Sequence, residues 1–161
     1  MARSKREGRL TDPRTQYRET VRPWSELLLG VGARSVIGIG FGVAGSIAGY
    51  FIGWLFLGSS VSLSAAVVIL TTGTGIGGGA VGFLGWVKLD DGPLANVPVL
   101  GLALAGGLTG AWGGLLFARA AYGMDIKTPD ARITAVAAAA LTANLMPALY
   151  AIAERALRRD G

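Results

Sequence analysis

The residues of this chain that could bind a nucleotide lie in one glycine-rich segment. Gly73, Gly75 and Gly78 match the G-x-G-x-x-G spacing that holds a pyrophosphate at a helix N-terminus, and the acidic pair Asp90–Asp91 follows them. Only 11 residues separate Gly78 from Asp90. A dinucleotide-binding unit needs a helix and a second strand, about 20 residues, in that interval. The spacing therefore gives only weak support for a nucleotide site.

The same segment has two further interpretations. Glycines spaced by four let neighbouring helices approach closely in a membrane. Alternatively, each glycine weakens helix propensity by about 1 kcal/mol relative to alanine, and a helix broken over residues 71–79 would form an ion or substrate site at mid-membrane. The favoured interpretation is packing, by Gly75, Gly78, Gly79 and Gly82. A broken helix would instead expose a polar lining, made of Thr71, Thr72 and Thr74 with Asn144 from the last apolar run.

Most catalytic and metal chemistry is excluded by what the chain lacks. There is no Cys, so disulfides and thiolate ligands or nucleophiles are absent. There is also no His, which removes the commonest general base and transition-metal ligand. No acidic residue lies inside a long apolar run, where a proton pump or an ion-coupled carrier would usually have one. We therefore expect no enzyme, and we predict no cofactor or metal.

The elements that hold these residues are four long apolar runs. Of the 161 residues, 52% are hydrophobic and 16% charged, against about 25% charged in a typical soluble domain. The charges concentrate at the ends and in short connecting segments. About 20 apolar residues span a bilayer as a helix. We predict an all-α polytopic integral membrane protein, a four-helix bundle with spans over about 36–57, 63–87, 97–118 and 131–153.

The two terminal segments outside the four spans are basic. Residues 1–22 read as a cytoplasmic tail and residues 154–161 as a second basic tail. Between the first tail and the first span, Arg34 interrupts the apolar sequence, and a charge at mid-membrane costs about 2.5–3.5 kcal/mol. We therefore predict an interfacial amphipathic helix over residues 23–35. The alternative is that this segment is a tilted extension of the first span.

The distribution of basic residues predicts the orientation. Twelve Lys and Arg residues lie on the side of the two termini and three on the other side. Positive residues favour the cytoplasmic side, so both termini are expected in the cytoplasm, with the protein in the inner or cytoplasmic membrane. The net charge of +5 suits anionic lipid headgroups at the tails. We expect the lipid bilayer as a partner and no nucleic acid.

Two glycine ladders, each spaced by four, mark the first and third spans. The first is Gly45, Gly49 and Gly53, and the second is Gly106, Gly110 and Gly114. They lie 61 residues apart within the matching segments VAGSIAGYFIGWLF and LAGGLTGAWGGLLF. This match indicates two tandem helical hairpins, unless frequent Gly and Ala align by chance. Spans one, two and three should pack backbone to backbone, with the glycine-free fourth span the looser member.

These patterns lead to one functional prediction and two alternatives. The prediction is a non-catalytic integral membrane subunit that packs through Gly and Ala faces, with other membrane subunits or with itself. The alternative is a small channel, transporter or membrane-permeabilising protein built around the Gly- and Thr-rich second helix. A weaker third interpretation is a subunit that contacts lipid or pigment in grooves between glycine faces.

Overall fold

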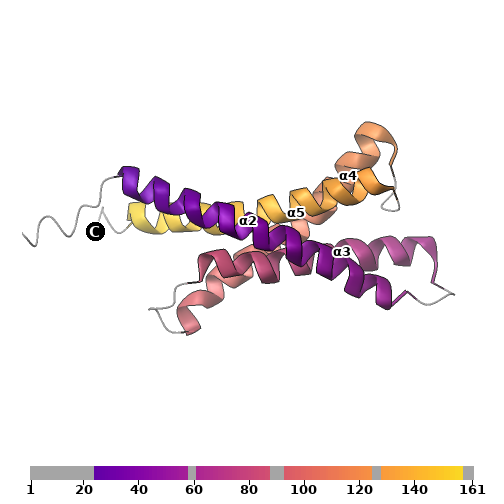
Figure 1. Ribbon diagram of the computed structural model, residues 1–161, viewed down its shortest axis with the longest axis horizontal. Coiled ribbons are helices and arrows are strands. Elements are labelled where there is room, and N and C mark those ends of the chain that lie inside the picture. The colour runs from indigo at the N-terminus through magenta and orange to yellow at the C-terminus, as the bar shows by residue number, and fades with distance from the viewer. Residues whose placement is uncertain (1–23, 58–60, 88–92, 125–127, 158–161) are drawn as a thin grey trace, which may run out of the picture.

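A computed structural model describes residues 24–57, 61–87, 93–124 and 128–157 of the chain. Within these ranges every regular element is helical: α2 (Trp24–Leu55), α3 (Leu63–Gly82), the 3-10 helices η1 (Phe83–Trp86) and η2 (Pro93–Asn96), α4 (Val97–Tyr122) and α5 (Pro129–Leu157). The four long helices form an elongated bundle, in which α2 begins and α5 ends at the same end (Figure 1). Each is long and apolar enough to cross a membrane. The predicted all-α class is confirmed within these ranges, as are four helices of the length and hydropathy that spanning a membrane requires.

Local sequence signals set the helix ends. Ser62 caps α3, because its hydroxyl oxygen accepts a hydrogen bond from the Ala65 N–H at 3.3 Å. Thr128 caps α5 in the same way, with the Ala131 N–H at 3.3 Å. Gly123 follows the last residue of α4 at φ 65°, a left-handed conformation that favours glycine. The helices therefore begin and end at residues whose side chains or conformational freedom favour a helix end.

The first helix is longer than the predicted first span. α2 runs without a break through Arg34, so a separate interfacial helix over residues 23–35 is not confirmed. Nothing between Trp24 and Arg34 interrupts the helix: there is no proline, and arginine is a good helix former. Its 32 residues extend over about 48 Å, beyond the ~30 Å hydrocarbon core. The exposed Arg34 side chain can therefore lie near one membrane surface.

The glycine-rich helix is also continuous. α3 is α-helical over all of Thr71–Gly79, so the structure does not support the alternative of a helix broken there. Close packing on several sides compensates for the weak helix propensity of its glycines, as described below. Regular α-helix ends only after Gly82, where η1 completes the predicted second span. At the other predicted boundaries, α4 continues to Tyr122, and α5 continues to Leu157 in the predicted C-terminal tail.

The helices pack as two hairpins joined through a shared centre. The most extensive interfaces are α2 with α3 and α4 with α5. α3 also contacts α4, and α5 also contacts both α2 and α3 (Figure 1). Among the described residues, no Cα atom of α2 lies within 8 Å of a Cα atom of α4. Backbone-to-backbone packing between spans one and three is therefore absent, and α5 is as closely packed as the glycine-rich helices.

The core is built mostly from small residues. Near one end of the bundle Leu70, Leu115 and Ala135 pack together, and near the other Trp86 packs with Val99 and Ala148. α5 contributes Ala131, Ala135, Ala139, Ala140 and Ala143, each fully buried. Alanine thus does on α5 what glycine does on α2 and α4. Residues 1–22, the predicted basic tail, and residues 158–161 of the predicted C-terminal tail lie outside the described residues.

Candidate helix-packing site

The first glycine ladder lies against α3. Gly45, Gly49 and Gly53 are all buried. A Cβ atom added at Gly53 would lie 3.1 Å from the carbonyl oxygen of Ile69, and one at Gly49 or Gly45 would overlap a carbonyl oxygen of α3. In the reverse direction, a Cβ atom on Gly73 would lie 2.5 Å from the Gly49 carbonyl oxygen. The two backbones are therefore in contact along the whole ladder.

The second ladder lies against α5. Gly106, Gly110 and Gly114 are buried, and a Cβ atom on Gly114 would lie 2.8 Å from the carbonyl oxygen of Thr134. At Gly106 the contact includes a hydrogen bond between helices, because the Thr142 hydroxyl donates to the Gly106 carbonyl oxygen. Gly110 leaves the space that the Thr142 side chain occupies. This ladder closes the α4–α5 hairpin as the first closes the α2–α3 hairpin.

The glycines of α3 face three neighbours. Gly75 and Gly79 face α4, since Cβ atoms there would lie 2.8 Å from Leu108 Cα and 2.6 Å from the Ala103 carbonyl oxygen. Gly78 lies against Ser46 of α2 and, at 3.4 Å from the added Cβ, Ala139 of α5. Gly82 lies beside α2, with 3.4 Å from its added Cβ to Gly42 Cα. All ten predicted packing glycines are thus buried against another helix of the same chain.

The four residues predicted as a polar lining do not share one space. Thr71 and Thr74 are buried in the bundle core, whereas Thr72 lies on the outer groove between α2 and α3. The Thr74 hydroxyl donates to the Leu70 carbonyl oxygen at 2.8 Å, which satisfies it within its own helix. Among the described residues, the hydroxyls of Thr71 and Ser46 have no hydrogen-bond partner. Ser46 is fully buried, although no pattern in the sequence singles it out.

Asn144 joins distant segments of the chain through a buried side-chain hydrogen bond. Its Oδ1 accepts from the Trp86 Nε1–H at 2.9 Å, and its Nδ2 donates to the Ala140 carbonyl oxygen at 2.8 Å. Both side chains are almost completely buried. Gly38 provides the room, because a Cβ atom there would overlap the Asn144 amide. The Asn144 side chain of α5 therefore holds η1, which directly follows α3, against α5.

A second row of small residues faces away from the bundle. On α4 the row is Gly101, Ala105, Thr109 and Gly113, all exposed and spaced by four. No atom lies within 4 Å of a Cβ atom added at Gly101 or Gly113. α2 has a shorter exposed row of the same kind, Gly40, Ala44 and Ala48. The four-residue spacing of these rows is visible in the sequence, but spacing alone does not show which face of a helix is buried.

Two apolar grooves run along the outside of the bundle. The groove between α2 and α3 has a volume of about 590 Å³, and its lining contains no charged residue. The groove between α2 and α5, about 440 Å³, ends at Arg132 and Tyr50. In the part of the chain that the structure describes, no three acidic side chains come together to hold a metal ion.

Comparison with known proteins finds no matching family model, no curated protein with significant similarity and no solved structure with a significant match. The proposals that follow therefore depend on the geometry of this chain alone.

The contact between ladders predicts a large difference between two substitutions on α2. Gly49→Ala places a methyl group against the Gly73 carbonyl, so the helices must separate. We expect a loss of about 1–3 kcal/mol in the free energy of unfolding, the usual cost of overpacking. Gly40→Ala is the control, because its methyl group meets open space and alanine favours the helix. Unfolding in mixed micelles, followed by circular dichroism, measures both; equal stabilities would contradict the contact.

The hydrogen bond of Asn144 is tested by two matched Trp→Phe changes. Trp86→Phe leaves the Asn144 Oδ1 buried without its donor. Trp112→Phe is the control, since the indole N–H of Trp112 has no hydrogen-bond partner among the described residues. Hydrogen bonds between membrane helices contribute about 0.6–1.7 kcal/mol, so Trp86→Phe should destabilise the bundle by that much more than Trp112→Phe. Equal losses in the free energy of unfolding for the two variants would mean that the hydrogen bond does not stabilise the bundle.

Proposed function

We propose that this protein is a non-catalytic integral membrane subunit that assembles with itself or with other membrane proteins through small-residue helix faces. The observation that carries the proposal is the exposed row Gly101, Ala105, Thr109 and Gly113 on α4. Lipid tails are as apolar as leucine, so membrane helices associate through close packing rather than through the hydrophobic effect. A flat row of small residues facing lipid is suited to a further helix.

The proposed contact uses a different face from the ladders that first indicated packing. Gly106, Gly110 and Gly114 already lie against α5, and Gly45, Gly49 and Gly53 against α3. The close backbone contacts of these six glycines are thus already made within the chain. The proposed assembly therefore depends on the outward rows, and the inner ladders serve the fold of the single chain.

The second outward row supports a subunit with two contact faces. Gly40 and Ala44 of α2 correspond to Gly101 and Ala105 of α4 at the same offset of 61 residues that relates the buried ladders. Since no Cα atom of α2 lies within 8 Å of one in α4 among the described residues, the two rows are on separate parts of the surface. We infer that the chain is a tandem duplication of one hairpin, each copy with an inner and an outer small-residue face.

The alternative of a channel or transporter lacks a comparable observation. It drew on a break over Thr71–Gly79, and α3 is continuous there. Thr72 also lies apart from the buried Thr71 and Thr74, so the three hydroxyls do not line one passage. The geometry therefore favours the assembly subunit.

For orientation we propose that both termini lie in the cytoplasm, with the protein in the inner or cytoplasmic membrane. Twelve of the fifteen Lys and Arg residues lie on the side of the termini, and positive residues favour the cytoplasmic side. The start of α2 and the end of α5 lie at one end of the bundle (Figure 1), as this orientation requires.

Assembly is tested by adding bulk to the outward row of α4. Gly101→Leu and Gly113→Leu fill open space, so the bundle should remain folded while a partner helix is held away. We expect association, measured as mass in mild detergent and by co-purification, to weaken at least about tenfold, or 1.4 kcal/mol. Ala153→Leu, at an exposed position of α5, is the control. A wild-type protein that is a stable monomer without partners would overturn the proposal.

Orientation is tested by single cysteines in the naturally cysteine-free chain. Ser59→Cys lies between the first two spans, and Ser4→Cys lies in the N-terminal tail. A membrane-impermeant maleimide is added to cells whose cytoplasmic membrane is intact and directly reachable from outside. It should label Ser59→Cys, and it should label Ser4→Cys only after that membrane is permeabilised. The opposite pattern would place the termini outside the cytoplasm.

A further inference from the structure

The groove between α2 and α5 combines an apolar floor with one cation. Its volume is about 440 Å³. The apolar lining is contributed by both helices: Val43, Ile47 and Phe51 from α2, and Ile133, Val136 and Ala137 from α5. From Val43 to Phe51 this floor extends about 12 Å along the helix axis. The single charged residue in the lining is Arg132.

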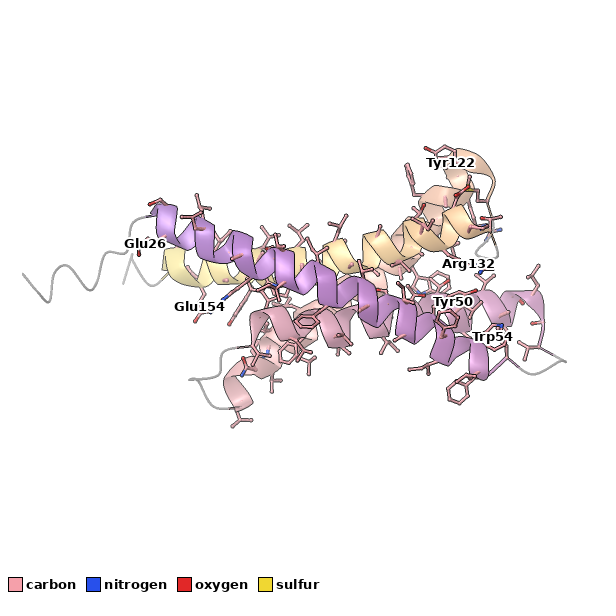
Figure 2. All side chains as sticks on the ribbon, viewed as in Figure 1. Glu26, Tyr50, Trp54, Tyr122, Arg132 and Glu154 are labelled. Carbon is pink, nitrogen blue, oxygen red and sulfur yellow. The ribbon has the colours of Figure 1, made fainter. Side chains whose placement is uncertain are left out.

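Arg132 is held at the end of the groove by Tyr50. The guanidinium carbon lies 5.3 Å from the centroid of the Tyr50 ring, a distance that favours a cation–π interaction. Figure 2 shows the two side chains together where α2 and α5 diverge from the bundle centre. Both are half-buried. Because a guanidinium has five N–H donors, it can contact the ring and other protein groups and still donate to an anion.

The position of Arg132 suits a lipid headgroup. It lies in the first turn of α5, so it lies near a membrane surface while the groove runs toward the membrane interior. The positive end of the α5 dipole adds to the attraction for an anion.

We propose that this groove is a binding site for an anionic phospholipid, with one acyl chain along the apolar floor and the phosphate against Arg132. The charge pattern supports this ligand, because an apolar groove that ends at a cation is complementary to a hydrocarbon chain that ends in a phosphate. Since bulk lipid is as apolar as the groove, the headgroup supplies the selectivity. The groove between α2 and α3 is larger but has no charged residue in its lining, so the proposal does not extend to it.

The site is independent of the outward row of α4, because it uses α2 and α5. It is also distinct from attraction of lipid to the basic tails, since Arg132 lies at the opposite end of the bundle from the start of α2 and the end of α5 (Figure 2). A positively charged site at that end is unexpected from the overall charge distribution, which concentrates Lys and Arg near the termini.

The experiment measures retained lipid by native mass spectrometry of the full-length protein with added phosphatidylglycerol or phosphatidylcholine. Wild type should retain phosphatidylglycerol in preference. Arg132→Gln should lower that retention at least about tenfold, whereas Arg34→Gln, which removes an exposed charge elsewhere on α2, should leave it unchanged. Ala137→Phe fills the groove from an exposed position and should also lower retention while Arg132 is intact.

Each result decides the proposal. Loss of phosphatidylglycerol in Arg132→Gln and Ala137→Phe, with retention in Arg34→Gln, supports it. Equal retention in wild type and Arg132→Gln overturns it. Unchanged retention in Ala137→Phe also overturns it, and this variant decides the question if Arg132→Gln fails to fold. If water-soluble glycerol phosphate competes as well as the whole lipid, Arg132 binds a free anion and the acyl-chain site is wrong.

Discussion

Contact between helix backbones without intervening side chains is the constraint on which this structure depends. In lipid, apolar side chains gain little by leaving one apolar medium for another, so van der Waals contact and hydrogen bonds must hold the helices together. Gly49 and Gly73 meet in this way, and so do Gly75 and the α4 backbone. A methyl group at these positions would force the helices apart. The choice of residue at each contact row therefore decides which helices can be neighbours.

That constraint explains the central place of α3. Its glycines lie on several sides of one helix, so α3 can touch α2, α4 and α5 at the same time. α5 reaches a similar density with alanine, whose methyl group fits where the facing helix carries glycine, as at Gly114 and Ala138. The larger buried groups then mark the two ends: Leu115 near one, and Trp86 with Asn144 near the other. The hydrogen bond between Trp86 and Asn144 depends on direction, whereas the contacts between small residues that make up most of the packing do not.

The sequence predicts the four spans well, because charge and hydropathy act locally and the charges lie outside the apolar runs. It predicts less well which faces meet. A row such as Gly106, Gly110 and Gly114 specifies a flat side of one helix and says nothing about the helix across from it, so α5 was not foreseen as its partner. Arg34 suggested a separate interfacial helix over residues 23–35, but α2 continues through it, because a charge by itself does not end a helix. Ser46 and the Trp86–Asn144 bond depend on distant segments meeting, which no local pattern shows.

The outward row of α4 differs from the inner ladders in what it contributes to the single chain. Glycine in a helix costs about 1 kcal/mol relative to alanine. At Gly110 close packing against α5 offsets that cost, but at Gly101 and Gly113 no atom lies near enough to do so. The isolated bundle would be more stable with alanine at both positions. An exposed glycine that weakens its own helix is consistent with a contact made outside the chain, where a second backbone supplies the compensation that this bundle does not.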